Sequence, residues 1–391
     1  MRTDAAPLRV LFVTDAPAVG GSEVYMREII PPMRAHGVHA EVAMPDVPGT
    51  ADFRAQLQAR GIPVHAYRTL AEVARVEGEG RGFDLTVLSS WNPRGYRKYY
   101  RALRGPFVSL VHDQLMLHIP GLPQGVYRAC YEWLQAGDIR GAQHVITVSE
   151  WGAAYLRRHH RMTQVHAVPN GVDTVKFRPG DPGERAALRG RLGFRGFTVL
   201  NPARMSIEKN HPAVIAAAWQ APELHFVLVG TGYLESALKR AAPRNVTFLG
   251  KRHDMPELYR AADVVLQPTI AENQSLATLE ALASGTPVVT NDIPAQRELI
   301  RMGQEGLLVR GGAPGYVAAL RALAAHPDAL RRMGLAARQS VLDGHTLDGN
   351  ARHLATLLTE LAARHTAGPV TGPGEGSAGA SGARVTSAGR P

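Results

Sequence analysis

The chain has 391 residues, of which 45% are hydrophobic and 20% are charged, which suits two globular domains and excludes an intrinsically disordered chain. It contains no apolar stretch of eighteen residues and only one cysteine, Cys130, so we expect no membrane-spanning helix, no intrachain disulfide and no cysteine-based zinc site. The formal net charge of +10 favours anionic partners, although an arginine-rich proteome accounts for this charge equally well.

The N-terminus runs from Met1 and Asp4 directly into an apolar segment at 8–13, which predicts a buried strand and not a secretory leader. With a single cysteine in the chain, a cytoplasmic location is expected. The first helix is expected from Ser22 toward His36, and Pro31-Pro32 should kink or end it, because proline lacks the backbone N–H that a helix needs.

Short apolar, β-branched segments alternate with helix-length segments along the chain. We expect strands in the first half at 8–13, 38–44, 62–67, 84–88, 107–111 and 145–148. In the second half we expect them at 198–201, 225–229, 246–249, 264–267, 288–290 and 306–309. Continuous apolar strands separated by helices indicate parallel sheets covered on both faces. Two such series predict an α/β protein of two doubly wound, Rossmann-like domains with a cleft between them.

The two series meet near residues 168–178. We therefore place the N-terminal domain at 1–172 and the C-terminal domain at 173–345, followed by a helix at 346–366 that packs back toward the N-terminal domain. The segment 367–391 consists largely of Gly, Ser, Ala, Thr and Pro without an apolar period, which predicts a disordered tail.

The first strand leads into a loop with Gly20 and Gly21, just before the helix that starts near Ser22. Two glycines at a helix N-terminus let the backbone approach an anionic group. Plain turn chemistry explains them as well. Further along, His112 and Asp113 follow the strand expected at 107–111, at a carboxyl end where parallel sheets place active-site residues. A lone histidine is more often structural, so this signal is weak by itself.

A helix expected at 94–104 carries five cations and three tyrosines. Such a segment suits an anionic membrane surface or an anionic acceptor. A solvated helix whose tyrosines pack partly on the domain is the other interpretation. The basic cluster at 157–161 has the same two interpretations.

In the second half, the segment 199–211 carries Arg204 and Lys209 on a loop between a strand and a helix. No Asp-x-Asp triplet occurs in the chain, so the usual carboxylate ligands of a divalent metal are missing. Positioned cations can neutralise a leaving diphosphate instead, arginine through paired hydrogen bonds and lysine as a point charge. The alternative is that both side chains are merely solvated.

The most informative segment is 267–289, where a strand, a polar loop and a helix follow one another. The helix begins near Ser275, and its free N–H groups and positive dipole suit a phosphate. Glu272 lies on the loop, and Glu280 lies roughly 6 Å beyond Leu276 at about 1.5 Å per residue. One carboxylate can therefore reach a sugar on one side of a diphosphate while the other reaches a ribose on the far side. The alternative is that both glutamates are surface residues that only contact solvent.

In this order and over nearly the whole chain before the tail, these motifs resemble the family-4 retaining glycosyltransferases of the GT-B fold. That family has two glutamates separated by seven residues, with a loop between them that often reads Gly-Phe-Gly, then an apolar helix and Gly-x-Pro-Val-Val. Asn273-Gln274-Ser275 replaces Gly-Phe-Gly in this chain, which predicts a differently shaped pocket around the donor sugar.

The resemblance implies a GT-B fold whose N-terminal domain binds the acceptor and whose C-terminal domain binds a nucleotide sugar. It implies that Glu272 lies against the donor sugar, that Glu280 binds the ribose, and that Arg204 and Lys209 neutralise the diphosphate. His112 would contact the transferred sugar and position the acceptor. Further donor-side residues would be Gly20, Gly21, Gly230, Arg252, Asn273, Gln274, Ser275 and Leu276, with Ser22 and Asp113 on the acceptor side.

The implied reaction moves a sugar from a UDP- or GDP-linked donor to an acceptor hydroxyl with retention of configuration and without a metal or other cofactor. The acceptor is not specified by the sequence. A nucleotide-sugar epimerase on a related fold is one alternative, and it would consume the donor without an acceptor. A nucleic-acid-binding protein that uses the +10 charge is the other, with steeply salt-dependent binding. Neither accounts for the glutamates and the Arg/Lys loop together, so we expect no nucleic-acid partner.

Overall fold

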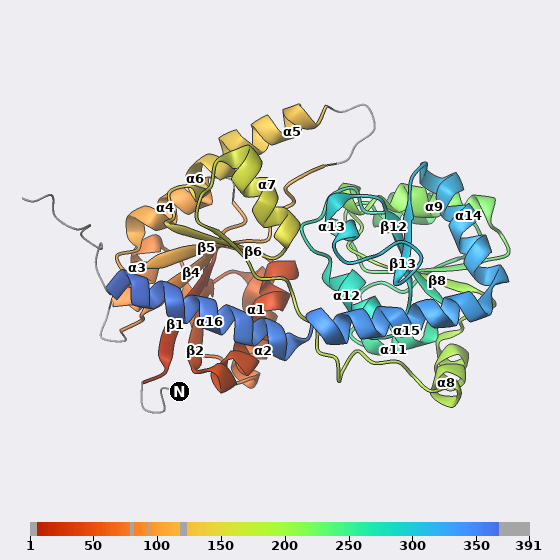
Figure 1. Cartoon of the computed structure of the whole chain (residues 1–391), viewed down its shortest axis with the longest axis horizontal. Coiled ribbons are helices and arrows are strands. Elements are labelled where there is room, and N and C mark those ends of the chain that lie inside the picture. The colour runs from red at the N-terminus through yellow and green to blue at the C-terminus, as the bar shows by residue number, and fades with distance from the viewer. Residues whose placement is uncertain (1–5, 79–81, 93, 118–122, 367–391) are drawn as a thin grey trace, which may run out of the picture.

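The computed structural model describes residues 6–78, 82–92, 94–117 and 123–366. Two α/β units lie side by side, and the helices α15 (Pro327–Gly344) and α16 (Leu347–Thr366) run along both of them (Figure 1). The tail expected at 367–391 lies outside the described residues. Within these ranges no helix is both long and apolar enough to cross a membrane.

The N-terminal unit is built on a parallel sheet of seven strands in the order β3-β2-β1-β4-β5-β6-β7. Its strands are β1 (Leu8–Thr14), β2 (Val38–Pro45), β3 (Val64–Tyr67), β4 (Leu85–Ser89), β5 (Phe107–Val111), β6 (His144–Thr147) and β7 (Val165–Ala167). Its helices are α1 (Gly21–Met33), α2 (Ala51–Ala59), α3 (Leu70–Gly78), α4 (Gly95–Ala102), α5 (Gln124–Tyr131), α6 (Gly137–Ile139) and α7 (Glu150–His160). The sequence did not predict β7.

The C-terminal unit has a six-stranded parallel sheet in the order β10-β9-β8-β11-β12-β13. Its strands are β8 (Thr198–Pro202), β9 (His225–Val229), β10 (Val246–Phe248), β11 (Val264–Gln267), β12 (Val288–Asn291) and β13 (Gly306–Val309). Its helices, before α15, are α8 (Pro182–Leu192), α9 (His211–Gln220), α10 (Glu235–Ala241), α11 (Met255–Ala261), α12 (Leu276–Ala283), α13 (Pro294–Arg297) and α14 (Gly312–Ala325). Short 3-10 turns lie at Arg34–His36, Pro48–Thr50 and Ile207–Lys209, and a π turn at Glu132–Ala136.

Both sheets reverse their strand order at one point, between β1 and β4 in the first sheet and between β8 and β11 in the second. At such a point the loops leave neighbouring strands in opposite directions and open a crevice at the carboxyl ends. The loops after β1 and β8 carry Gly20 and Arg204, and the loop after β11 carries Glu272. The topology therefore assigns the predicted site loops to the two switch points.

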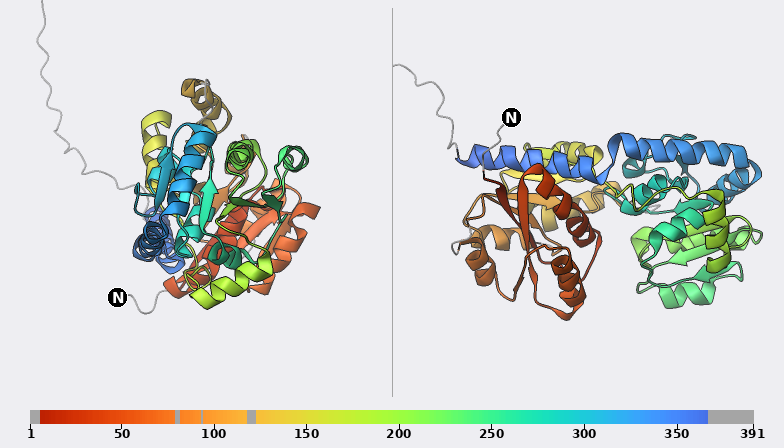
Figure 2. Two further views of the ribbon diagram at one scale, coloured as in Figure 1. Left: turned by 90° about the vertical axis from the view of Figure 1, so that its right-hand side faces the viewer. Right: turned by 90° about the horizontal axis from the view of Figure 1, so that it is seen from below.

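Each sheet is buried on both faces by an apolar layer of its own, as the continuous apolar strands predict. The final helix α16 completes the layer on one face of the N-terminal sheet, where Leu354 and Leu358 pack in the same cluster as Ile29 and Ile30 of α1. The chain thus crosses back from the C-terminal unit, and the second view of Figure 2 shows α15 and α16 along the same side of both units.

Pro31-Pro32 do not end the first helix where they occur, because α1 includes both prolines, ends at Met33 and continues as a 3-10 turn to His36. Proline at position 31 leaves the carbonyl of Arg27 without its helical partner. The Nη1 atom of Arg60 donates to that carbonyl at 3.3 Å. Full burial of Ile29, Ile30 and Met33 then holds the last turn on the sheet.

Candidate functional site

A cavity of about 720 Å³ lies between the two units, at the carboxyl ends of both sheets. Most of the predicted site residues line it: Gly20, Gly21, Ser22, His112, Asp113, Arg204, Lys209, Glu272, Asn273, Gln274, Ser275 and Leu276. A cavity of similar size, about 650 Å³, surrounds Trp219 at the opposite end of the C-terminal sheet. We assign the site to the interdomain cavity, because parallel sheets bind ligands at the carboxyl ends of their strands.

The two cations of the loop after β8 are both paired with carboxylates. The ammonium group of Lys209 forms an ion pair with Glu272, whose side chain is 9% exposed. The guanidinium of Arg204 contacts Glu208 at 2.9 Å while remaining 61% exposed. Burial works to raise the pKa of Glu208, but hydrogen bonds from Ser206 and Arg204 lower it below its usual value. Both cations of the site are therefore balanced by carboxylates of the same domain, and any anionic ligand would have to compete with them.

Backbone contacts join the loop after β8 to the loop after β11. The N–H of Ile270 and the hydroxyl of Thr269 both donate to the carbonyl of Glu208, at 2.9 and 3.0 Å. Asn210, in the left-handed region with φ 54°, donates its amide to the carbonyl of Pro268 at 3.1 Å. The Lys209–Glu272 pair is thus held by a shared framework and does not depend on the two side chains alone.

The helix N-terminus predicted near Ser275 is present, with Ser275 as the N-cap of α12. Its hydroxyl accepts from the N–H of Thr278 at 3.2 Å. The next two residues, Leu276 and Ala277, line the cavity, and N–H groups in a first helical turn have no partner within the helix. They and the helix dipole make this edge of the cavity suited to an anion.

On the N-terminal side, the buried carboxylate of Glu23 organises the loop after β1. It accepts hydrogen bonds from the N–H of Gly20 and from the hydroxyls of Thr14 and Ser22, each at 3.0 Å. Burial raises its pKa above the usual value. Ser22 in turn accepts from the indole N–H of Trp91 at 2.8 Å. The predicted acceptor residue Ser22 therefore also holds the cavity wall together.

The two glycines of this loop have different roles. A Cβ on Gly20 would lie 2.2 Å from the ring of Trp91, whereas one on Gly21 would meet no described atom within 4 Å. Gly20 is required by packing against Trp91, and Gly21 leaves open space in the cavity. Close approach of a ligand to the backbone is therefore available at Gly21.

His112 and Asp113 lie together on the N-terminal wall, as predicted for the carboxyl end of β5. The Nε2 atom of His112 is buried without a hydrogen-bond partner among the described residues, and its ring packs edge-on against Tyr25. Burial lowers the pKa of His112 to about 4, so the imidazole is neutral at pH 7. Burial also raises the pKa of Asp113 to about 6, against the hydrogen bond from Tyr131 at 2.9 Å.

Glu280 lies outside the main cavity, in an adjoining pocket of about 50 Å³ that Arg27, Glu28 and Lys176 also line. Leu276 borders both spaces, so a diphosphate at the start of α12 would have Glu272 on one side and Glu280 on the other. Typical ligand pockets measure about 300–1,000 Å³, and this pocket must widen before a nucleoside can enter.

Gly230 and Arg252 also do not line the cavity. Gly230 has φ 129°, and a Cβ there would lie 2.2 Å from the carbonyl oxygen of Ala203, so this glycine shapes the turn beside Arg204. Arg252 is bound by both carboxylate oxygens of Asp254. The structure thus separates these two residues from the group around Glu272.

Sequence reasoning missed three carboxylates of the site region, Glu23, Glu208 and Glu298. Glu23 lies three residues after Gly20, at the spacing of a helix capping box. Glu208 lies four residues after Arg204, a recognised ion-pair spacing. These two signals were present in the sequence. Glu298 accepts from the N–H groups of Glu150 and Trp151 in the other domain, a contact that no local pattern predicts.

Comparison with known families and structures agrees with this geometry. Residues 19–176 match the family described as "Glycosyltransferase Family 4" and residues 197–326 that described as "Glycosyl transferases group 1". The chain is similar to the putative glycosyltransferase EpsD of Bacillus subtilis, with 32% identity over 56% of this chain and 60% of that protein. It is also similar to a GDP-mannose-dependent alpha-mannosyltransferase of Mycolicibacterium smegmatis, with 27% identity over 86% and 93% of the two chains. The match to EpsD thus spans less than two thirds of that protein.

Two solved structures establish the fold. HepE of Anabaena, solved with UDP and glucose, superposes with a TM-score of 0.76 at 22% identity, over 90% of this chain and 99% of that chain. Sucrose-phosphate synthase of Thermosynechococcus elongatus gives a TM-score of 0.74 at 19% identity, over 91% and 100%. The architecture is therefore GT-B, with two Rossmann-like domains that face each other across a cleft.

The protonation of Glu280 yields a test of this geometry. Burial raises its pKa from 4.5 to about 7, despite the hydrogen bond from Tyr259. The folded state therefore binds this proton more tightly than the unfolded state. The stability of the wild type relative to that of Glu280→Gln should fall as pH rises from about 4.5 to about 7, by at most about 3.5 kcal/mol at about 1.4 kcal/mol per pKa unit. Urea unfolding of both proteins at several pH values measures this, and parallel stability curves would contradict it.

Proposed function

Because the chain belongs to the glycosyltransferases of group 1 and family 4, we propose that it transfers a sugar from a nucleoside diphosphate to an acceptor hydroxyl, with retention of configuration and without a metal ion. One observation carries this proposal. Two cations, a helix N-terminus and a carboxylate meet in one interdomain cavity, on Arg204, Lys209, α12 and Glu272. This set matches a diphosphate joined to a sugar.

In the proposed mechanism the incoming diphosphate takes Lys209 from Glu272, and the freed carboxylate accepts hydrogen bonds from the donor sugar. The bond between the anomeric carbon and the diphosphate oxygen then breaks, and the acceptor oxygen bonds to the same face of that carbon. The acceptor proton passes to the departing diphosphate. Arg204 and Lys209 stabilise the charge that grows on the diphosphate as the bond breaks.

The N-terminal wall would position the acceptor. His112, with its pKa lowered to about 4 by burial, is neutral at pH 7 and offers its buried Nε2 atom for a hydrogen bond with a sugar hydroxyl. Closing the domains over the reactants would exclude water and favour transfer over hydrolysis.

Incubation with UDP- and GDP-linked sugars tests the reaction directly, since the transferase releases free nucleoside diphosphate. Activity should persist in excess EDTA, because Arg204 and Lys209 supply the positive charge that a metal would otherwise provide. Chromatography of the products and of the released nucleotide measures both points. An epimerised donor without nucleotide release would indicate the epimerase instead. Complete loss of turnover in EDTA, reversed by added metal, would refute metal independence.

Arg204→Ala and Lys209→Ala should each lower kcat by about 100- to 1,000-fold, with a smaller rise in the donor KM, because a fixed cation acts mainly on charge that develops in the transition state. Steady-state kinetics measures the split. Matched controls are Arg331→Ala and Lys239→Ala, which remove exposed, ion-paired cations that do not line the cavity. Turnover within about threefold of wild type in both site variants would defeat the assignment.

We also propose that a basic surface of the N-terminal domain binds anionic membranes. In α4 the tyrosines Tyr96 and Tyr99 are buried in the core and Tyr100 is partly buried, whereas the cations of 94–104 are exposed. The guanidinium of Arg94 stacks on the exposed ring of Trp133, and Arg128 of α5 contacts His159 of α7. The basic surface is defined by the exposed cations of α4, α5 and α7, which are Arg97, Lys98, Arg101, Arg128, Arg157 and Arg158. Of these, Arg97 is ion-paired with Asp138 at 3.0 Å.

Co-sedimentation with phosphatidylglycerol vesicles tests this surface. Binding should occur at low salt, weaken with added salt and be absent with phosphatidylcholine, because each basic residue near an anionic surface contributes about 1 kcal/mol. The double variant Lys98→Glu/Arg101→Glu should abolish it, whereas Arg331→Glu/Arg332→Glu on α15 should leave it unchanged. Equal loss in both double variants would show that only net charge matters.

A further inference from the structure

The amide of Asn273 crosses from the donor-side loop into the N-terminal domain. Its Nδ2 atom donates to the hydroxyl of Thr147 at 3.0 Å and to the carbonyl of Val111 at 3.4 Å. Its Oδ1 atom accepts from the hydroxyl of Ser149 at 2.6 Å. The side chain is 2% exposed, so all three contacts are shielded from water, where an unpaired amide would be costly.

The partners of Asn273 lie beside the reacting groups. Val111 is the last residue of β5 and immediately precedes His112, and Asn273 immediately follows Glu272. The single amide of Asn273 therefore connects the backbone next to His112 with the backbone next to Glu272. The distance between the two walls of the cavity is set at this point.

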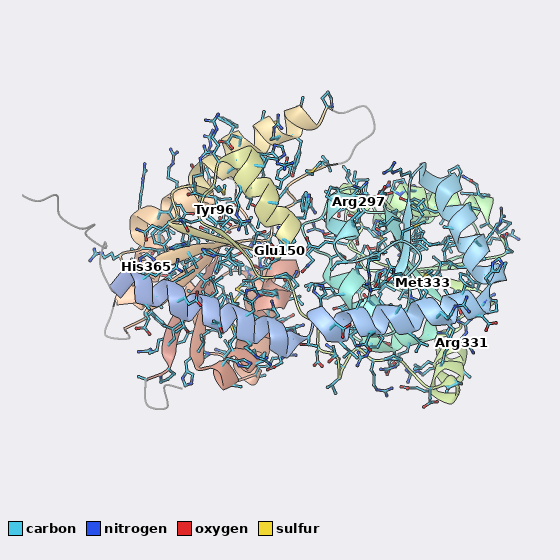
Figure 3. All side chains as sticks on the ribbon, viewed as in Figure 1. Tyr96, Glu150, Arg297, Arg331, Met333 and His365 are labelled. Carbon is cyan, nitrogen blue, oxygen red and sulfur yellow. The ribbon has the colours of Figure 1, made fainter. Side chains whose placement is uncertain are left out.

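A second bridge lies beside the first. The Oε1 atom of Gln274 accepts from the backbone N–H of Asn170 at 2.5 Å. The Nε2 atom of Gln274 donates to Glu298 at 3.4 Å. Glu298 accepts from the N–H groups of Glu150 and Trp151, at 3.1 and 2.8 Å, at the start of α7. Glu150 lies at the end of α7 that faces the C-terminal domain (Figure 3).

The N-terminal domain has a socket for this amide. A Cβ on Gly152 would lie 2.6 Å from the Oδ1 atom of Asn273 and 2.7 Å from the hydroxyl of Ser149. Ser149 also caps α7 by accepting from the N–H of Gly152 at 2.9 Å. A glycine at the first turn of α7 is therefore needed for Asn273 to enter.

We propose that Asn273 and Gln274 are positioning residues that form an interdomain latch, which aligns Glu272 and the start of α12 with His112 only when the two domains are closed. The proposal rests on the glycosyltransferase function proposed above. With the latch open, the C-terminal domain keeps its diphosphate-binding groups, but the donor sugar is no longer aligned with the N-terminal wall that positions the acceptor. The latch therefore acts on turnover and leaves nucleotide binding intact.

The latch can be broken from either side. Asn273→Ala removes the amide, and Gly152→Ala fills the socket without changing the donor-side loop. The matched control for the first is Asn245→Ala, whose amide donates to three carbonyls within its own domain at 3.0 Å each. The control for the second is Gly190→Ala on α8, where a Cβ would meet no described atom within 4 Å.

Hydrogen exchange measures the latch independently of any activity. The N–H groups of Asn170, Glu150 and Trp151 donate across the interface, so they should exchange at least about tenfold faster in both latch variants than in wild type or the controls. Mass spectrometry of peptides that cover 147–152 and 168–171 reads this change. Unchanged exchange in both latch variants would overturn the proposal.

Kinetics then tests the positioning role. Each latch variant should lose about 10- to 100-fold in kcat, because small misplacement of reactants is costly, while calorimetry with UDP and GDP should give affinities within about threefold of wild type. The kcat of the double variant Asn273→Ala/Gly152→Ala should be no lower than that of the less active single variant, since both substitutions break the same interaction. Losses that multiply, or a matching loss of nucleotide affinity, would refute the latch. A wild-type protein that binds neither nucleotide would refute the proposed function instead, and hydrogen exchange would still decide whether the latch exists.

Discussion

The ion pair between Lys209 and Glu272 joins the loops after β8 and β11, on the two sides of the switch point of the C-terminal sheet. Both side chains are largely shielded, and a charge that is buried without a partner is costly. Each therefore keeps the other in the cavity while no ligand is bound. A dianionic ligand offers Lys209 a stronger partner, and its arrival frees the carboxylate for a neutral, hydroxyl-bearing group. In the proposed function, the same pair thus stabilises the site and prepares it for a donor.

The opposite wall is built from buried, hydrogen-bonded carboxylates rather than from ion pairs. Glu23 accepts hydrogen bonds from the end of β1 and the loop that follows it. Asp15 accepts hydrogen bonds from the hydroxyl of Ser90 and from the backbone N–H of Trp91, which follow β4. These contacts fix Trp91, which in turn requires glycine at position 20. In the proposed function, the rigidity of this wall allows an acceptor to be placed accurately against a donor held by the other domain.

The two domains are joined by two kinds of contact. On one side α16 returns to the N-terminal domain and contributes Leu354 and Leu358 to its core. On the other side Asn273 and Gln274 bridge the domains directly. The first connection is apolar and lies away from the cavity, whereas the second is polar and lies beside the reacting groups. A polar bridge can exchange its partners for water when the cleft opens, which suits a contact that must break and re-form.

The sequence by itself determined the parallel α/β architecture, because strands buried on both faces must be apolar throughout, and it placed nearly every strand to within two residues. It also located His112, Arg204, Lys209 and Glu272, since each follows a strand and local order suffices to bring each to the carboxyl edge of its own sheet. Only the tertiary structure decided that Lys209 pairs with Glu272, that Glu280 lies in a separate pocket, and that Asn273 reaches Ser149 across the cleft. The ion pair joins residues 63 positions apart within one domain, and the hydrogen bond joins residues 124 positions apart in different domains. The first depends on how two loops of one sheet meet and the second on how two domains pack, which no local pattern of residues encodes.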